Sequence, residues 1–595
     1  MASTPLLYVL VIILSAVYLL RRRSNPLYAI PAVGPSLPLL SYIGALRFTR
    51  HAHEMLQEGY IKYKGSAFRL AQLDRWVVVL CGPKMNEELQ RMPDDQVSFL
   101  DAAEDLVQTK YTIAKNVIEN PIHISVMRGP LTRNLAPLLL DVIDEINIGV
   151  EEHIPTRGDE WVSVPGLATM TQIVSRASNR VFVGLPMCRD PEYFKIISNF
   201  PRDVAKGRFI LSITPTFLKP IIGPLLPWSR RTVRQYSALM KPIIEERQRL
   251  LLEHRDPHDP DRPNDFMTWL IEEGRAVDQP VDLLVNALLS SNFVAIHTSS
   301  ISVTHALYNL AAYPEYQQPV RDELVEVIKA EGWTKQAFGK MWKLDSFMRE
   351  SQRMFGISAI SVIRKALKDV TLSDGTVIPA GTLIAVAAEG THYDEGSYDN
   401  PYIFNPFRFS DMREDEGERI KHQYVSTSSE YVSFGHGKHA CPGRFFASNE
   451  LKAILSRLIL DFDMKFGGDG QRPPNQWFGS SIIPSQTANI ELFEVNDPRD
   501  ANTMIQLNTS PRSNATTQVI RIPSSKFGVG AKDTAQEAAL LAKLGLCILS
   551  ATVAFVERRV GRDRGDATLD GVWILEGWAI LGGREGIAAS GGVLT

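Results

Sequence analysis

The sequence contains little cysteine. Four cysteines occur in 595 residues, and they are far apart: Cys81, Cys188, Cys441 and Cys547. This spacing argues against a disulfide framework and indicates that the bulk of the chain faces a reducing compartment. It also argues against an iron–sulfur cluster, which needs clustered thiolates.

The sequence also lacks an excess of charge of either sign and a nucleotide-binding fingerprint. The formal net charge is -3, so the composition gives no reason to expect nucleic acid as a partner. No glycine-rich turn follows a predicted strand in the pattern that binds dinucleotides. Electrons for a redox reaction would therefore have to come from a separate protein.

Long apolar runs are few, and the first lies at the N-terminus. Residues 6–20 are almost wholly apolar, and Arg21, Arg22 and Arg23 follow at once. A cleavable signal peptide has its positive charges before the apolar run. By the positive-inside rule the arginines stay in the cytosol, so residues 1–24 are predicted to form one membrane anchor with the rest of the chain cytosolic. An interfacial helix is the alternative, because a typical span has about 20 residues.

The remaining chain is predicted to contain a linker, one domain and a tail. Residues 25–49 carry several prolines, which fix φ and remove N–H donors, so a stiff linker is expected there. Residues 50–500 show mainly helical periodicity with a few short strands, which predicts a mainly α domain with small β-sheets. Residues 501–595 differ in composition and form a tail of unknown role, for which disorder, a weak second membrane segment and a gene-prediction error stay open.

Local patterns locate the main elements of the domain. Helices are expected over residues 138–154, 230–253, 281–312 and 445–459, and strands at residues 67–70, 76–80 and 370–378. The run 281–312 is apolar on almost all sides and would cross a whole domain at about 1.5 Å per residue. It also carries His297 and Thr298, which a lipid-facing helix would hide poorly. A buried core helix that lines a site is therefore predicted.

The segment around Cys441 carries the clearest chemical signal. It reads Phe434-Gly435-His436-Gly437-Lys438-His439-Ala440-Cys441-Pro442-Gly443. Its glycines permit tight turns, and an apolar helix follows. Amide N–H groups at a helix N-terminus lower a thiol pKa and favour the thiolate, which is a ligand for a soft metal. The alternatives are a buried, inert cysteine and a zinc site with His436 and His439, which would lack a fourth ligand.

This segment resembles the heme-binding loop of the cytochrome P450 family, Phe-x-x-Gly-x-His/Arg-x-Cys-x-Gly. Every fixed position matches: Phe434, Gly437, His439, Cys441 and Gly443. The resemblance implies the cytochrome P450 fold and a heme b cofactor with Cys441 as the axial ligand of its iron. It further implies that Phe434 lies against the thiolate side of the heme and that His439 pairs with a heme propionate.

A carboxylate and two arginines also resemble the family. Glu350 and Arg353 stand at i and i+3 on one predicted helix face, and they match the family's Glu-x-x-Arg pair. Arg408, in the segment Asn405-Pro406-Phe407-Arg408-Phe409, matches the arginine that completes it. Their implied role is structural, as a buried hydrogen-bonded triad that locks the segment holding the Cys441 loop.

Other basic residues resemble the family's propionate contacts. Arg364 stands where many relatives have an arginine that contacts a heme propionate, although an ordinary exposed arginine is the alternative. The family's Trp-x-x-x-Arg helix has no matching tryptophan near residues 120–128. His123 and Arg128 are the candidates to serve a propionate in its place.

The segment Ala295-Ile296-His297-Thr298-Ser299 resembles the family's oxygen-activation segment. The resemblance implies that Thr298 lies over the distal face of the iron, where its hydroxyl can hydrogen-bond dioxygen and organise water for proton delivery. His297 replaces the usual acid and can also relay protons near neutral pH, so the departure concerns the proton route and not the fold. A threonine hydroxyl bonded back to its own helix is the alternative for Thr298.

The resemblance as a whole implies a heme-thiolate monooxygenase of the endoplasmic reticulum membrane. Its partners would be O2, a lipophilic substrate and an NADPH-dependent cytochrome P450 reductase that docks on the Cys441 side near Lys438 and Arg444. The segments 295–299 and 345–347 look most like those of fungal members, including those that oxidise terpenoids such as ent-kaurene. A heme-thiolate isomerase or dehydratase without a reductase, and a noncatalytic heme-binding membrane protein, remain the alternatives.

Overall fold

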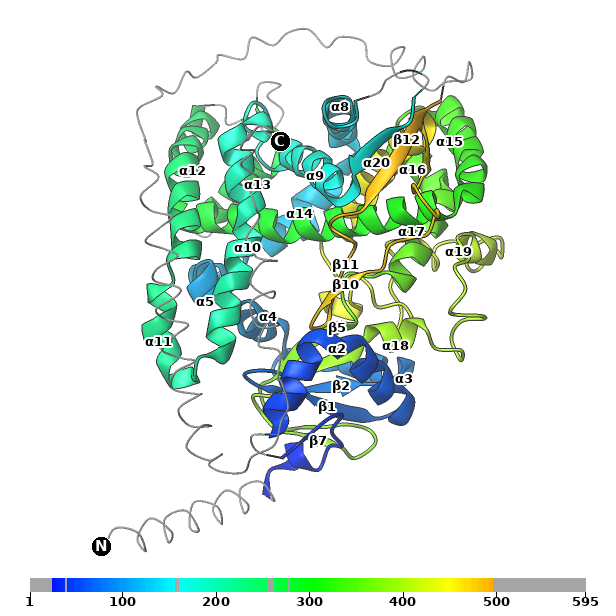
Figure 1. Ribbon diagram of the computed structural model, residues 1–595. Helices are drawn as coiled ribbons and strands as arrows, with labels where there is room; N and C mark the ends of the chain where they lie inside the picture. Colours follow the sequence, from blue (N-terminus) through cyan, green and yellow to red (C-terminus); the bar gives the residue numbers. More distant parts are fainter. Residues whose placement is uncertain are drawn as a thin grey trace, which may run out of the picture. The chain divides into compact units, whose positions relative to one another are not determined.

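The computed structural model describes residues 24–495, apart from residues 38–39, 156–157, 159, 254–255, 257–261 and 277–278. These residues belong to one compact unit, which is mainly helical with small β-sheets, as predicted (Figure 1). The expected anchor, apart from Ser24, and the expected tail lie outside the described residues.

The elements have the following bounds. The helices of the first half are η1 Pro26–Tyr28, α2 Leu40–Lys62, α3 Pro83–Arg91, α4 Phe99–Val107, α5 Thr109–Thr112, α6 Asn116–Glu119, α7 Ile122–Val126, η2 Met127–Leu131, α8 Leu135–His153, α9 Gly166–Phe182, η3 Met187–Arg189, α10 Pro191–Ile213, η4 Thr216–Leu218, α11 Lys219–Ile222, η5 Gly223–Leu225 and α12 Pro227–Glu253. Those of the second half are α13 Phe266–Ala276, α14 Val281–Ala312, η6 Pro314–Tyr316, α15 Gln317–Glu331, α16 Lys335–Lys340, α17 Trp342–Met354, α18 Ala388–His392, α19 Arg408–Met412, η7 Gly437–His439 and α20 Arg444–Asp461. The strands are β1 Ala67–Ala71, β2 Trp76–Leu80, β3 Val97–Ser98, β4 Val162–Pro165, β5 Ile360–Ala366, β6 Val370–Thr371, β7 Val377–Ile378, β8 Leu383–Ala387, β9 Phe462–Lys465, β10 Gln476–Phe478, β11 Ser481–Ile483 and β12 Asn489–Glu494.

Helix α14 is the core of the helical part. It has the predicted bounds and packs against α9, α12, α17 and α20, and Figure 1 shows it running through the middle of the molecule. Its composition would suit a membrane span, but 56% of its most apolar stretch is buried inside the protein. The prediction of a core helix is therefore confirmed.

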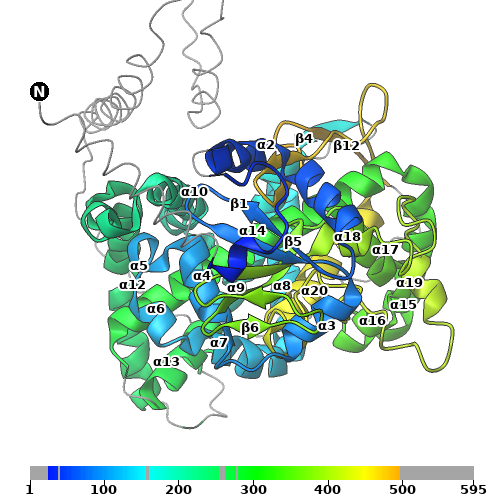
Figure 2. The same ribbon diagram turned by 90° about the horizontal axis from the view of Figure 1, so that it is seen from below.

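The largest sheet has the strand order β1-β2-β8-β5-β3. Because side chains alternate along a strand, Val77 and Val79 join one hydrophobic cluster while Val78 and Leu80 join another. Helix α2 covers the first face and α3 the second, on opposite sides of the sheet in Figure 2. This arrangement places α3 next to the loop that carries Cys441.

The prediction that residues 25–49 form a stiff linker is wrong. Ile30 and Val33 are buried in the two clusters of the sheet, the Val33 N–H donates to the carbonyl of Arg69, and α2 begins at Leu40. The prolines do prevent a long helix before Leu40, but the chain between them packs on the sheet because its apolar side chains have a core to join.

A buried acid joins three helices of the core. Glu450 of α20 is 1% exposed and accepts a hydrogen bond from the Ser178 hydroxyl of α9 at 2.5 Å. Ser299 of α14 lies close to the same carboxyl group, whose Oε2 has no hydrogen-bond partner among the described residues. No cation among the described residues pairs with it. Burial raises the pKa of Glu450 to about 7, and the two hydroxyls oppose this rise. Sequence reasoning missed this residue, because an acid in an amphipathic pattern normally faces water.

Replacing Gly59 by alanine is expected to destabilise the contact between α2 and β1. A Cβ at Gly59 would lie 2.3 Å from Cζ of the buried Phe68 ring. Such overpacking lowers the free energy of unfolding by about 1–3 kcal/mol, which urea unfolding followed by circular dichroism would measure. The control is Gly339→Ala in α16, where a Cβ meets no heavy atom within 4 Å and stability is kept or raised. Equal stabilities of the two variants would contradict the packing described.

The stability of the protein is expected to fall between roughly pH 5 and pH 7 because of Glu450. The folded carboxyl keeps its proton up to about pH 7, whereas the unfolded one releases it near its ordinary pKa, so the folded state binds more protons in this window and loses stability as pH rises. The variant Glu450→Gln removes this contribution. Thermal unfolding at a series of pH values should therefore show a flatter profile for Glu450→Gln, and an unchanged one for the exposed control Glu326→Gln. A profile of Glu450→Gln parallel to that of the wild type would refute the assignment.

Candidate active site

The loop before α20 is a closed, glycine-bounded turn. The Cys441 N–H donates to the Phe434 carbonyl at 2.8 Å, which joins the two ends of the loop. Gly435 and Gly437 have φ values of +69° and +72°, a region that favours glycine. A Cβ on Gly437 would lie 1.9 Å from Oε1 of Gln90 in α3. The loop therefore needs glycine both for its turn and for its close approach to α3.

The Cys441 thiol lies just before the first turn of α20 and is partly buried. Burial raises the pKa of Cys441, and the opposing effects of the Gly443 and Arg444 N–H groups and of the Arg444 charge are smaller. The expectation of a lowered pKa is therefore wrong for the protein by itself, because desolvation outweighs the helix N-terminus. A bound metal cation would reverse the balance, since a coordinated thiol is deprotonated.

The two histidines of the loop bind acids instead of a shared metal. Nε2 of His436 lies 3.2 Å from Oε2 of Glu87, and Nε2 of His439 lies 2.6 Å from Oδ1 of Asp94. Among the described residues no group of three or more His, Cys, Asp or Glu side chains could hold a metal ion. The zinc alternative therefore has no support.

The predicted carboxylate–arginine triad is assembled and buried. Arg353 donates to both oxygens of Glu350, with Nε–Oε2 and Nη2–Oε1 distances of 2.8 Å, and Arg408 Nε lies 3.2 Å from Oε1. A buried charge is costly unless it is paired and hydrogen-bonded, and here one carboxylate takes both guanidinium groups.

His392 connects this triad to the Cys441 loop. Arg353 Nη1 donates to the His392 carbonyl at 2.6 Å, and the Val432 N–H, two residues before Phe434, donates to Nε2 of His392 at 3.1 Å. Burial, with the charges of Arg353 and Arg349, lowers the pKa of His392 to about 3, so the ring is neutral and accepts this bond. Sequence reasoning missed His392, because nothing near it in the chain indicates the contact.

Arg364 is buried and His123 partly buried, and neither forms an ion pair with an acid among the described residues, although the charge of Asp94 acts on Arg364. The Arg364 side chain lies beside a bulge of β5, where Val362 has φ +47°, and its Nη1 donates to the Ile363 carbonyl at 2.8 Å. Among the described residues it forms no ion pair, and burial lowers its pKa to about 10. Nδ1 of His123 is buried without a partner, and burial lowers the pKa of His123 to about 4. Because buried polar groups are normally partnered, both residues fit an anionic group such as a heme propionate.

One face of α14 is uncovered in the middle of the helix. Ala287 and His305, which lie on the same face toward either end, are buried, whereas Val294 is 49% exposed and Thr298 and Ile301 are partly exposed. These three positions are four and three residues apart and share a helix face. The uncovered face fits a flat group or substrate beside α14.

The sequence predicted roles for Thr298 and His297 of α14, and the contacts of Thr298 lie within the helix itself. The Thr298 hydroxyl donates to the Val294 carbonyl at 2.9 Å, which is the geometry of the back-bonded alternative. Burial lowers the pKa of His297, so its ring is neutral at neutral pH. The roles expected for both residues toward dioxygen stay predictions.

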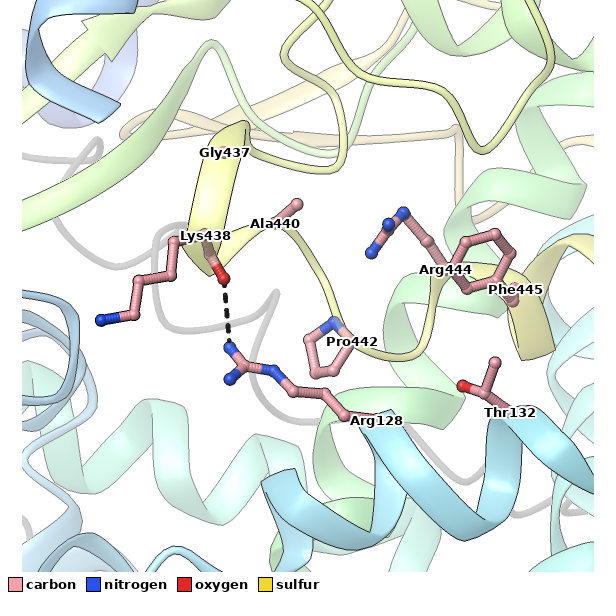
Figure 3. Close-up of a pocket in the computed structure, with 8 residues that line it drawn as sticks. All are labelled: Arg128, Thr132, Gly437, Lys438, Ala440, Pro442, Arg444 and Phe445. Carbon is pink, nitrogen blue, oxygen red and sulfur yellow. Dashed lines mark hydrogen bonds between the residues drawn. The ribbon is translucent and has the colours of Figure 1, made fainter. Parts of the chain in front are cut away.

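A cavity of about 270 Å³ opens on the side of the loop that carries Lys438 (Figure 3). Its lining is formed by Arg128, Thr132, Gly437, Lys438, Ala440, Pro442, Arg444 and Phe445. Arg128 Nη2 donates to the Lys438 carbonyl at 3.3 Å, and Arg444 Nη1 donates to the Cys441 carbonyl at 2.8 Å. Three cations therefore surround a hollow next to Cys441.

Comparisons with known proteins show the family and the fold. The sequence model of the family described as Cytochrome P450 matches residues 31–492. Cytochrome P450 monooxygenase 103 of Postia placenta is 99% identical over 490 residues, which cover 82% of this chain and 98% of that protein. Ent-kaurene oxidase P450-4 of Gibberella fujikuroi is 31% identical over 475 residues, 78% of this chain and 93% of that protein.

A solved structure shares the fold. The structure titled "Retinoic acid bound cyanobacterial CYP120A1" matches with a TM-score of 0.59 and 18% identity, over 78% of this chain and 99% of that one. The relatives named monooxygenases favour this activity over the isomerase and noncatalytic alternatives. From the family match, the fungal relatives and the fold, the chain belongs to the cytochrome P450 family, among the monooxygenases of fungal type that carry heme as their cofactor.

Proposed function

We propose that this chain is a membrane-anchored monooxygenase that oxidises a terpenoid, using O2 and electrons from an NADPH-dependent cytochrome P450 reductase. The observation that carries the proposal is the position of Cys441 in a closed glycine turn at the start of α20. This helix packs against α14, whose uncovered face carries Thr298. The proposed sulfur ligand thus lies in the turn before one helix, and the candidate proton donor lies on a second helix packed against the first.

In this proposal Cys441 Sγ binds the heme iron, and Arg364, His439 and His123 hold the propionates. Heme supplies, when bound, the iron chemistry that activates dioxygen. Phe434 packs against the core and against Tyr424, with ring centroids 5.2 Å apart, and so shields the sulfur from water. The bulge in β5 directs Arg364 into the protein, where its charge needs an anion.

Proton transfer is assigned to the uncovered face of α14. A rotation about χ1 takes the Thr298 hydroxyl from the Val294 carbonyl toward that face, where it can donate a proton. Neutral His297 has one ring nitrogen that accepts a proton and one that donates, so it can pass protons to the Thr298 region. In this proposal His297 takes over proton transfer from the acid that the family usually has at this position.

The substrate is proposed to be lipophilic and a terpenoid. Phe293, Val294 and Ala295 place apolar surface on or beside the uncovered part of α14, which suits a hydrocarbon skeleton. The relative named ent-kaurene oxidase is named for a substrate of this class. The segment Ile357–Ile363 supplies the other candidate wall.

Exposed apolar side chains support association with a membrane. Tyr42, Ile43 and Leu46 of α2 are more than half exposed, and so are Phe217 of η4 and Ile221 of α11. Soluble proteins rarely leave such apolar groups together in water. With the predicted anchor at residues 1–24, they support a single-pass protein of the endoplasmic reticulum whose catalytic domain is cytosolic and rests on the lipid.

The reductase is proposed to dock on the cavity of Figure 3. Arg128, Lys438 and Arg444 give this face positive charge next to Cys441. Lys438 is paired with Asp94, and Arg128 forms no ion pair with the described residues. A partner with an acidic surface would meet two cations, Arg128 and Arg444, whose hydrogen bonds within the described chain go only to backbone carbonyls.

Replacing Cys441 is expected to abolish both the spectrum and the reaction. The wild-type protein, reduced and treated with carbon monoxide, should show the red-shifted band of a thiolate-bound heme and convert ent-kaurene or a related terpenoid only with NADPH and reductase. Cys441→Ala should lose the band and the product, because no other sulfur lies in the loop, whereas Cys188→Ala should keep both. Product formed without NADPH would support the isomerase alternative instead, and a thiolate band in Cys441→Ala would disprove the ligand.

Reversing the charge of Arg128 is expected to weaken docking of the reductase. Arg128→Glu should raise the KM for reductase roughly tenfold, because it places like charges in contact. NADPH-dependent product formation at increasing reductase concentrations measures this, and added salt should reduce the difference. Because Arg128 donates to the Lys438 carbonyl of the Cys441 loop, the carbon monoxide band obtained with dithionite measures the intact heme content by which each rate is divided. Arg202→Glu, an exposed change on α10, is the control, and equal KM values for the two variants would exclude this docking site.

A further inference from the structure

Asp94 holds two residues of the Cys441 loop. It lies between α3 and β3, where its Oδ1 accepts a hydrogen bond from His439 Nε2 at 2.6 Å and its Oδ2 pairs with Lys438 Nζ. The contacts with Lys438 and His439 lower the pKa of Asp94 to about 2. Asp94 is therefore an anion throughout the physiological range.

The same segment binds the Cys441 loop at two further points. Glu87 of α3 binds His436, and Gln90 lies against Gly437. The neighbouring Asp95 does not take part, because its carboxylate pairs with Lys368 Nζ at 2.7 Å. Two adjacent acids thus have separate partners, and only Asp94 reaches the loop.

Asp94 and Phe99 together determine where the His439 ring lies. The rings of Phe99 and His439 are stacked at 6.1 Å with an interplanar angle of 23°, and Arg364 lies over the Phe99 ring at 5.9 Å. Because Asp94 occupies Nε2, Nδ1 is the remaining nitrogen, and it makes no hydrogen bond with the described residues. Nδ1 carries a hydrogen only when the ring is doubly protonated, and in that form its N–H is open to another acceptor. The ring stacks on Phe99, over which Arg364 lies.

We propose that Asp94 is a positioning residue of the heme site, which holds the His439 ring so that Nδ1 is left to bind a heme propionate. The proposal rests on the proposed function, in which His439 and Arg364 contact the propionates. Asp94 acts through His439 and does not touch the heme itself. Lys438, on the other oxygen, adds a second tie between Asp94 and the loop.

The rate of heme loss from the purified full-length protein tests this proposal. Transfer of heme to an excess of apomyoglobin should be about fivefold faster in Asp94→Asn than in the wild type, as expected for the loss of a partly exposed charged pair. Asp95→Asn makes the same charge change one residue away and should leave the rate unchanged. Equal rates for Asp94→Asn and Asp95→Asn would overturn the proposal.

A double-mutant cycle separates positioning from simple tethering of the loop. In a His439→Ala background, Asp94→Asn should have no further effect on heme loss, whereas in a Lys438→Met background its effect should persist. An undiminished effect in His439→Ala would show that Asp94 acts through the loop and would overturn the assignment. If Asp94→Asn does not accumulate with heme, Asp94→Glu, which keeps the charge, provides the same comparison with an intermediate rate expected.

The two proposals fail in different measurements. Cys441 ligation is judged by the thiolate band of the reduced wild-type protein with carbon monoxide. The role of Asp94 is judged by heme-loss rates, which can be read whatever the axial ligand is. A wild-type protein with the band but without a difference between Asp94→Asn and Asp95→Asn would refute only the positioning role.

Discussion

The hydrogen bond from the Cys441 N–H to the Phe434 carbonyl closes the turn on which the proposed site depends. A short loop rich in glycine has much conformational freedom to lose, so other parts of the chain must restrain it. His392 binds Val432 on one side and the triad through Arg353 on the other. Helix α3 contacts the loop through Glu87, which binds His436. Helix α20 follows the loop in the chain and packs into the core. The turn is thus held by segments that are far apart in the sequence.

Buried cations of two kinds surround this turn. Arg353 shares the carboxylate of Glu350 with Arg408 and has its charge compensated within the protein. Arg364 is equally buried but forms no direct ion pair with the described residues, and the charge of Asp94 offsets only part of its desolvation. Since an unpaired buried charge costs several kcal/mol, the first arrangement indicates a structural role and the second indicates that an anionic group completes the site. Heme propionates provide such anions.

Helix α14 is both the central core helix and one wall of the proposed site. Its environment favours neutral groups: burial lowers the pKa of His297 on the helix and raises that of Glu450 behind it. Both shifts have one cause, because a low dielectric disfavours the charged form of any group. The interior around α14 therefore disfavours the charged forms of His297 and Glu450, whereas the cavity beside the Cys441 loop is lined by cations.

The sequence by itself determined the features that depend on local pattern. The bounds of α14 followed from its apolar length and the turn before α20 from its glycines, whereas Cys441 as a ligand and the members of the triad were implied by the resemblance to the cytochrome P450 family. Only the tertiary structure decided how distant segments meet: residues 30 and 33 join the core, His392 links the triad to the loop, Asp94 binds His439, and Glu450 meets two serines. It also decided the pKa of Cys441, because local helix geometry favours the thiolate but burial by the whole fold outweighs it. Periodicity and spacing reflect interactions between residues that are close in the sequence. Desolvation and long-range hydrogen bonds exist only after the chain has folded.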